Sequence, residues 1–231
     1  MDPVPPPAIG RMFSSLAGRY RAFNRWSSLG LDTRWRRCLL KEVSGAQRVL
    51  DLGTGTGDLA WGIQASSSAG TVVAGIDLSL DMLRQARHYG NGGLPLWSQG
   101  SAAGIPFRTG CFDAVVSAFV LRNLWVGGVL PESLRECARV LESGGRLVFL
   151  DLTRPGNFWL RWGHCLYNRT MVPLWGRVFF GKEWPGSYLA NSIQALPSPQ
   201  DLRQLFEESG FSHFEHRPLS GGVVSLFIGK K

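Results

Sequence analysis

The 231-residue sequence lacks the features that mark several large classes of protein. No apolar run approaches the roughly 20 residues that a membrane-spanning helix needs. The chain has only four cysteines, and none belongs to a Cys-x-x-Cys motif or has histidine partners at metal-ligand spacing. We therefore expect no disulfide framework and no metal cofactor, and the cysteine usage fits a reducing cytoplasm.

Acidic residues are scarce in two stretches of a chain whose formal net charge is +8. Residues 11–41 include eight Lys or Arg and one acid, and residues 152–182 include five Lys or Arg and no acid. The second stretch is also rich in Trp and Phe, a combination that suits the surface of an anionic membrane. No nucleic-acid-binding motif accompanies the charge, so we expect no nucleic-acid partner. The alternative is a solvated face backed by core aromatics.

An apolar strand runs directly into a glycine-rich turn, in the sequence Val-Leu-Asp-Leu-Gly-Thr-Gly-Thr-Gly-Asp. Gly53, Gly55 and Gly57 allow positive φ and a close approach of a ligand to the backbone, and a helix is expected to begin directly afterwards. The third glycine of a dinucleotide-binding Gly-x-Gly-x-x-Gly motif is missing, because the positions that would hold it carry Asp and Ala. The tighter spacing favours S-adenosylmethionine (SAM), which has no pyrophosphate, as the cofactor.

Two acidic residues flank this turn at positions that suit a SAM site. Asp51 lies at the carboxyl end of the first strand and suits the ammonium of the methionine part, directly or through water. Asp77 ends a second strand over residues 71–77, 20 residues after Gly57, where it can accept hydrogen bonds from ribose hydroxyls. The alternative is a helix-capping Asp in a Rossmann-like domain that binds no ligand.

The order of predicted elements indicates one α/β domain over residues 11–231, after a proline-rich, disordered lead-in over residues 1–10. Helices fill residues 11–45, and a basic, aromatic insertion over residues 154–196 follows the fifth strand. We expect a mostly parallel, Rossmann-like seven-stranded sheet with an antiparallel C-terminal hairpin, as in SAM-dependent methyltransferases. Strands are predicted over residues 47–53, 71–77, 94–98, 112–118, 146–151, 211–217 and 222–229, and helices over 58–67, 79–89, 131–142 (capped by Gly144 and Gly145) and 199–209.

Segments along almost the whole chain resemble one family, the ubiquinone/menaquinone biosynthesis C-methyltransferases. The resemblance implies the class I SAM-dependent methyltransferase fold and methyl transfer from SAM to a ring carbon of a polyprenylated quinol, with demethylmenaquinol as the favoured acceptor. The matching segments are Tyr20 with Asn24, residues 28–31 (Ser-Leu-Gly-Leu), 34–37 (Arg-Trp-Arg-Arg), 51–58, 75–79 with Met82, 105–107, 112–113, 119–123 (Phe-Val-Leu-Arg-Asn), 151–155, 188–193 (Tyr-Leu-Ala-Asn-Ser-Ile) and 221–224.

The resemblance also implies roles for individual residues. Arg122 would stabilise a phenolate, with Asn123 orienting it, and Asp151 is the candidate proton acceptor. His164 is the one histidine considered as an alternative base. The predicted quinol-binding residues are Tyr20, Asn24 and Tyr188, and the predicted SAM-binding residues are Asp51, Gly53, Gly55, Thr56, Gly57, Asp77, Leu78, Ser101 and Ala102.

Three positions depart from the family's usual pattern. Ser101 replaces an Asp or Asn, Arg21 replaces an Asp, and Asn191 replaces a Glu. These departures leave two alternatives open: methylation of another lipophilic or small acceptor at oxygen or nitrogen, and a non-catalytic scaffold that binds SAM or lipid. We expect a cytoplasmic protein in transient, peripheral contact with the membrane. The choice between benzoquinol and naphthoquinol stays open, and a homodimer is compatible with the sequence but not required by it.

Overall fold

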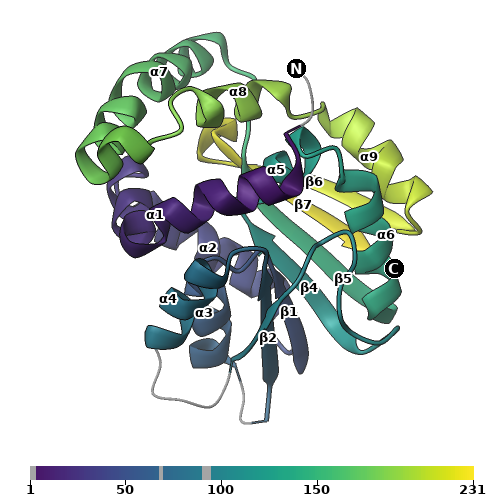
Figure 1. Cartoon of the computed structure of the whole chain (residues 1–231). Coiled ribbons are helices and arrows are strands. Elements are labelled where there is room, and N and C mark those ends of the chain that lie inside the picture. Colours follow the sequence, from purple (N-terminus) through teal and green to yellow (C-terminus); the bar gives the residue numbers. More distant parts are fainter. Residues whose placement is uncertain (1–3, 68–69, 90–94) are drawn as a thin grey trace.

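The computed structural model describes residues 4–67, 70–89 and 95–231. Its centre is a seven-stranded sheet with the order β3-β2-β1-β4-β5-β7-β6 (Figure 1). Strands β1 to β5 are parallel, and β7 runs antiparallel to both of its neighbours, β5 and β6. This arrangement confirms the predicted sheet and its C-terminal hairpin. The strands are β1 (Arg48–Leu52), β2 (Val72–Asp77), β3 (Leu96–Gln99), β4 (Phe112–Ala118), β5 (Leu141–Leu152), β6 (His213–Leu219) and β7 (Val224–Lys230).

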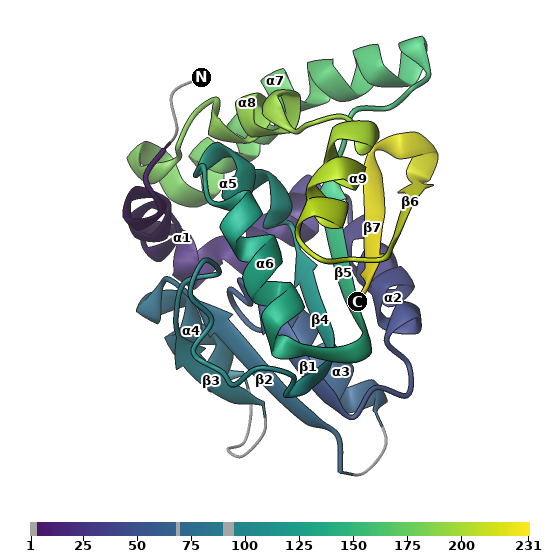
Figure 2. The same cartoon turned by 90° about the vertical axis from the view of Figure 1, so that its right-hand side faces the viewer.

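Helices cover both faces of the sheet, which explains why its central strands read as continuous apolar runs. Leu50 and Leu52 of β1 pack in one core with α5 (Leu121–Val126), α6 (Leu130–Val140) and α9 (Pro199–Glu208). Val49, on the other side of the same strand, packs with α2 (Leu31–Glu42) and α3 (Asp58–Ser66). The two helical layers lie on opposite faces of the sheet in Figure 2. Helix α4 (Leu80–His88) contacts β2 and β3.

Three further helices form a cap over the carboxyl end of the parallel strands. They are α1 (Pro6–Ser27), α7 (Phe158–Phe180) and α8 (Tyr188–Ala195), and α7 is followed by a short 3₁₀ turn, η1 (Gly181–Glu183). Leu16 and Phe23 of α1 pack against Val172 and Phe180 of α7 in a separate apolar cluster. The predicted N-terminal helices and the predicted insertion therefore meet above the sheet (Figure 1). Within the described ranges, no helix has both the length and the apolar character to cross a bilayer.

The N-terminal boundary differs from the prediction. Helix α1 begins at Pro6, so the predicted disordered lead-in is wrong for residues 6–10, and residues 1–3 lie outside the described part. Proline suits the first helical position because its missing N–H would have no partner there. The chain is also fixed just before the helix, where Val4 N–H donates to the Val126 carbonyl at 2.9 Å.

The join between α6 and β5 also differs. The helix ends at Val140 and the strand begins at Leu141, so Gly144 and Gly145 do not cap the helix as predicted. They lie in an irregular part of β5, where the pairing with β4 shifts register, and Gly144 has φ +81°. The short helix α5 was not predicted at all. The predicted start of the third strand, residue 94, lies outside the described residues.

Candidate active site

The glycine-rich turn between β1 and α3 has positive φ at all three of its glycines, with values of +65°, +56° and +76° at Gly53, Gly55 and Gly57. A Cβ atom on Gly53 would lie 2.7 Å from Val120, and one on Gly57 would lie 2.7 Å from Trp97. A Cβ on Gly55 would meet no atom within 4 Å. The outer glycines are therefore required by packing, whereas the middle one borders open space that a ligand can fill.

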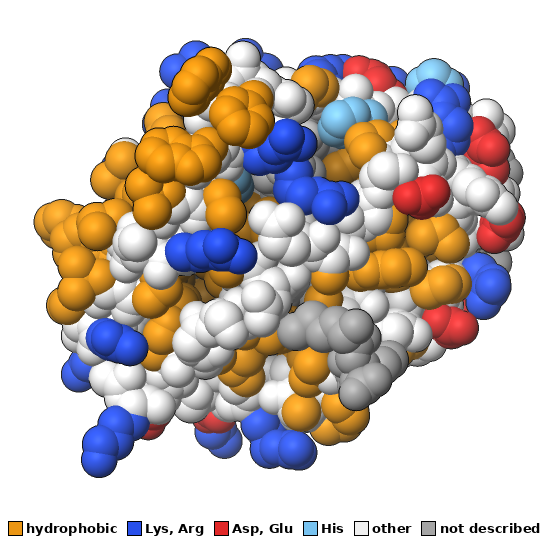
Figure 3. Space-filling view, turned by 90° about the horizontal axis from the view of Figure 1, so that it is seen from above, with side chains coloured by type: hydrophobic (Ala, Val, Ile, Leu, Met, Phe, Trp, Pro, Cys, Tyr) orange, Lys and Arg blue, Asp and Glu red, His pale blue; other side chains and the backbone are white. Residues whose placement is uncertain are grey.

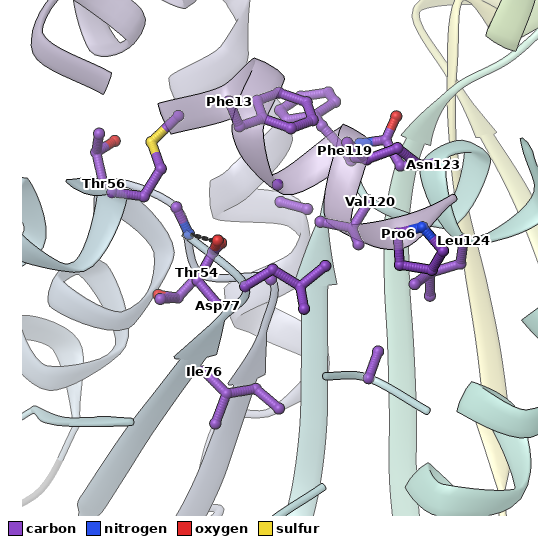
Figure 4. Close-up of a pocket in the computed structure, with 18 of the residues that line it drawn as sticks. Pro6, Phe13, Thr54, Thr56, Ile76, Asp77, Phe119, Val120, Asn123 and Leu124 are labelled. Atoms are coloured by element: carbon purple, nitrogen blue, oxygen red, sulfur yellow. Dashed lines mark hydrogen bonds between the residues drawn. The ribbon is translucent and has the colours of Figure 1, made fainter. Parts of the chain in front are cut away.

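Asp77 joins the tip of β2 to this turn. The Gly55 N–H donates to Asp77 Oδ2 at 2.8 Å (Figure 4). The Ser79 N–H donates to Asp77 Oδ1 at 2.8 Å. Burial raises the pKa of Asp77, and its main-chain donors oppose that shift. The main-chain donors do not use the full acceptor capacity of the carboxylate, so the side chain can accept a further hydrogen bond from a diol.

The turn and Asp77 line a cavity that we call the loop cavity. Its empty volume, including the open mouth, is about 960 Å³. Figure 4 shows Thr54 and Asp77 on one side of the space and Phe13, from α1, across from them. The predicted SAM residues that line it are Gly53, Gly55, Thr56, Asp77, Leu78, Ser101 and Ala102. Ser101 Oγ accepts a hydrogen bond from the Ala103 N–H at 3.2 Å, which holds the residues after β3 in a tight turn.

Asp51 lies at the carboxyl end of β1, as predicted, and its side chain is buried beneath the turn. Its side chain is 1% exposed and does not line the loop cavity. Its Oδ2 accepts hydrogen bonds from Thr54 Oγ1 at 2.6 Å and from the Ala60 N–H at 3.1 Å, and burial raises its pKa to about 6. These contacts show that Asp51 fixes the turn, and the predicted contact with a methionine ammonium, directly or through water, stays a prediction.

Arg36, on α2, lines the loop cavity although no role was predicted for it. Its guanidinium lies over the ring of Phe119, 5.2 Å from the ring centre. The Nε atom of Arg36 is buried and has no hydrogen-bond partner within the described residues. The only sequence feature that pointed to Arg36 was the Arg-Trp-Arg-Arg segment of the family resemblance. That segment contains three arginines and does not show which of them lies near the turn.

A second cavity adjoins the first, and we call it the helical cavity because α1, α7 and α8 form most of its wall. Its empty volume is about 1360 Å³, and Phe13, Tyr20, Asn24 and Phe119 line both cavities. Tyr188 also lines the helical cavity, so the three residues predicted to bind a quinol are brought together there. Most of the wall is apolar, which suits a lipophilic ligand.

A buried ion pair stands at the wall of the helical cavity. Arg122 Nη1 donates to Asp151 Oδ1, and the two side chains are 5% and 0% exposed. Asp151 also accepts from the Arg122 N–H at 3.0 Å and from the Leu152 N–H at 2.7 Å. Arg122 Nη1 donates in addition to the Phe119 carbonyl at 3.0 Å. Burial lowers the pKa of Arg122, but the charge of Asp151 and neighbouring groups outweigh burial, and the net shift is upward.

The predicted role of Asp151 as proton acceptor does not fit this geometry. Its carboxylate lines neither cavity and accepts three hydrogen bonds, two of them from Arg122. Protonation would break the ion pair and leave a buried guanidinium without its counter-charge. Arg122, in contrast, lines the helical cavity, and its Nε is buried without a hydrogen-bond partner among the described residues.

Asn123 and Tyr188 connect the two cavities. Tyr188 Oη donates to Asn123 Oδ1 at 3.2 Å, and Asn123 Nδ2 donates to the Phe119 carbonyl at 3.2 Å. Asn123 lines the loop cavity and Tyr188 the helical cavity. Burial raises the pKa of Tyr188 to about 12 and also raises the pKa of Tyr20. The charge of Arg122 partly offsets both increases. Both phenols are therefore protonated hydrogen-bond donors at neutral pH.

The sheet order, the glycine-rich turn with its strand-tip carboxylate, and the adjoining apolar cavity define a class I SAM-dependent methyltransferase. The fold is similar to that of a SAM-dependent methyltransferase from Thermotoga maritima, described as a possible histamine N-methyltransferase, with 17% identity, a TM-score of 0.66, and 96% of this chain and 99% of that one covered. It is also similar to human N-acetylserotonin methyltransferase in complex with SAM, with 18% identity, a TM-score of 0.60, and 92% and 57% covered.

The chain belongs to the ubiE/COQ5 methyltransferase family, which it matches over residues 5–231. It is 37% identical to a ubiquinone/menaquinone biosynthesis C-methyltransferase of Syntrophotalea carbinolica, over 94% of this chain and 92% of that protein. It is 33% identical to the demethylmenaquinone methyltransferase of Roseiflexus castenholzii (99% and 97%) and 35% identical to that of Thermus thermophilus (95% and 100%). Family membership confirms the predicted family, the enzyme class and SAM as the methyl donor.

Proposed function

We propose that this chain transfers the methyl group of SAM to a ring carbon of a polyprenylated quinol, with demethylmenaquinol as the acceptor. Relatives named for that activity cover almost the whole chain. The observation that carries the proposal is Arg122: a buried cation that lines an apolar cavity directly beside the loop cavity. An apolar cavity suits a prenylated ring, and the cation suits its ionised hydroxyl.

Arg122 supports the chemical step electrostatically. A ring carbon becomes a good nucleophile when a hydroxyl of the same ring ionises, and a nearby guanidinium stabilises the resulting phenolate. The effect is strong because the site has a low dielectric constant and the donor is fixed in advance. Asp151 positions the guanidinium, and Arg122 lines the helical cavity, where its charge would stabilise the phenolate oxygen.

The loop cavity supplies the groups that hold SAM. Asp77 accepts from the ribose hydroxyls, and the turn at Gly55 gives the ligand close access to the backbone. Ser101 and Ala102, which line the cavity, would flank the adenine. The Arg36 guanidinium, which lines the same cavity, would pair with the carboxylate of the methionine part. When bound, SAM would supply a methyl already activated by its sulfonium charge, and Tyr20, Asn24 and Phe119, which line both cavities, would align it with the acceptor.

Helix α7 presents the surface through which a lipid acceptor can reach the helical cavity. Its exposed apolar side chains share the helix with the exposed Arg161, Arg169 and Arg177. Figure 3 shows hydrophobic side chains beside Lys and Arg side chains on the face seen from above. Leu29 and Leu160 are 72% and 39% exposed and also line the helical cavity, so the mouth of the cavity opens in this surface. Rings and cations together suit an anionic membrane interface. The exposed apolar residues of α7 are Phe158, Trp159, Leu160, Trp162, Leu166, Met171, Leu174 and Val178.

A competition assay tests the proposal. Reduced demethylmenaquinone and the corresponding benzoquinol are supplied together with SAM in detergent. Mass spectrometry then identifies and quantifies the methylated products. We expect one methyl to be added, predominantly to the naphthoquinol. Predominant methylation of the benzoquinol would overturn the choice of acceptor, and SAM binding without methylation of either quinol would overturn the proposed reaction.

A further inference from the structure

His164 lies on the wall of the helical cavity. It belongs to one face of α7, because Leu160, His164, Asn168 and Val172 follow each other at four-residue intervals and all line the cavity. Side chains at this spacing project from the same side of a helix. His164 therefore shares one compartment with Arg122, the residue that we assign to the ionised hydroxyl.

His164 also borders a separate groove on the outside of the cap. This outer groove has an empty volume of about 400 Å³, and His164 and Asn168 line both the groove and the helical cavity. The half-buried imidazole thus borders the helical cavity on one side and the outer groove on the other. A group in that position can exchange a proton with a ligand on one side and with water on the other.

The imidazole is available for proton transfer. Among the described residues, none forms a hydrogen bond or ion pair with His164, and burial alone lowers its pKa from the ordinary value of 6.5. A neutral imidazole offers one nitrogen as acceptor and the other as donor. At neutral pH His164 is therefore predominantly in the form that can accept a proton.

We propose that His164 is the general base that accepts the hydroxyl proton of the acceptor and releases it through the outer groove. This inference rests on the proposed quinol methylation. In the reaction the O–H bond breaks and its proton moves to the imidazole, and the ring carbon then bonds to the methyl as the C–S electron pair stays on sulfur. Loss of the proton on that carbon to water restores an aromatic phenolate, which takes up one proton from water. One proton is thus released for each methyl transferred.

The other ionisable groups around the two spaces are less suited to this task. Burial raises the pKa of Tyr20 and Tyr188, so both remain protonated. Asp32 accepts a hydrogen bond from Ser28 Oγ at 3.0 Å and lies 3.8 Å from Arg25 in an ion pair. The titratable or charged residues that line these spaces with His164 are Tyr20, Asp32, Arg122, Arg154, Arg161, Cys165, Tyr167, Arg169 and Tyr188.

The test compares His164→Gln with His213→Gln, an exposed histidine on β6 that lies outside all three spaces. For the wild type and His213→Gln we expect kcat to rise with pH through a pKa below 6.5 and then level off. For His164→Gln we expect kcat at neutral pH to fall about 100-fold, as for loss of a general base, and the acid limb to disappear. SAM affinity should stay unchanged, because His164 does not line the loop cavity, and this affinity also verifies that the variant is folded.

Two further measurements separate a base from a merely structural residue. Imidazole in the buffer should restore turnover of His164→Ala in proportion to its neutral form. A halogenated quinol, whose hydroxyl is already ionised at the assay pH, should reduce the deficit of His164→Gln. An unchanged acid limb, or a loss of turnover that neither treatment reduces, would overturn the role of His164 while quinol methylation stands. A wild-type enzyme that methylates no quinol would overturn both.

Discussion

The loop cavity and the helical cavity are built in different ways, although they share four residues. The loop cavity rests on backbone geometry at the ends of β1 and β2, where one short motif sets the φ angles and one carboxylate meets the turn. The helical cavity is formed by side chains on α1, α7 and α8, which lie far apart in the sequence. The comparison predicts that substitutions in the first cavity change SAM affinity, whereas substitutions in the second change turnover or delivery of the acceptor.

The largest expected effect comes from Arg122. In Arg122→Ala we expect kcat to fall about 10³-fold, in the range for loss of a fixed donor to a developing anion, with SAM affinity retained. The substitution also leaves Asp151 buried without its partner, which destabilises proteins by roughly 3–5 kcal/mol. Arg122→Lys keeps the charge and serves as the folded comparison, with a smaller loss of kcat. Turnover kinetics and calorimetric SAM titration provide the readouts, and normal turnover in either variant would contradict the assigned role.

Substitution of Asp77 tests the prediction that changes in the loop cavity alter SAM affinity. Asp77→Ala should weaken SAM binding by about 1.5–3 kcal/mol, because hydrogen bonds to a charged acceptor are lost, while kcat at saturating SAM changes little. Asp81, an exposed neighbour whose carboxylate pairs with Arg84, provides the control substitution Asp81→Ala. Calorimetry measures both affinities. Equal SAM affinities for the two variants would remove Asp77 from the site.

The raised pKa of Asp51 predicts that the stability of the fold depends on pH. Its pKa is raised to about 6 in the folded chain from an ordinary value of 3.8, so the folded state binds this proton more tightly than the unfolded state. The Asp51 contribution is therefore most favourable below pH 4 and is lost as the pH rises toward 6. Relative to wild type, the free energy of unfolding of Asp51→Asn should rise by on the order of 2 kcal/mol between pH 4 and pH 7. Denaturant titrations at both pH values measure it, and a pH-independent difference would contradict the buried carboxylate.

The smallest expected effect concerns membrane contact. Replacing Trp159 and Trp162 with Ala should weaken binding to anionic liposomes about tenfold, because two exposed rings no longer enter the interface. Turnover of a short-tailed, water-soluble quinol should not change. Trp125→Ala removes an exposed ring from α5 and should have no effect. Flotation with anionic liposomes measures the binding. If the wild type does not float with the liposomes, or if its flotation is insensitive to salt, the electrostatic part of the contact is contradicted.

The sequence predicted the parts of the molecule that depend on short-range pattern. The strands, the sheet type and the position of Asp77 follow from apolar runs, glycine spacing and chain order, and the structure agrees with them. Tyr20, Asn24 and Tyr188 were grouped through the family resemblance, and they line one cavity.

Tertiary contacts decided what the sequence could not show. Asp51 and Asp151 both end buried strands, and the pattern does not reveal whether such a carboxylate faces a ligand, a turn or an arginine. The place of Arg36 depends on how α2 packs beneath α1. The early start of α1 depends on contacts with α5, which no local signal encodes.

The most direct test of the central claim follows the methyl group itself. Reduced demethylmenaquinone is incubated with the enzyme and SAM that carries a ¹³C-labelled methyl, and the product is analysed by carbon NMR. We predict a single enriched signal in the region of a methyl bonded to an aromatic carbon. A signal in the methoxy region would show transfer to oxygen, and either that result or the absence of any labelled product would contradict carbon methylation in the helical cavity.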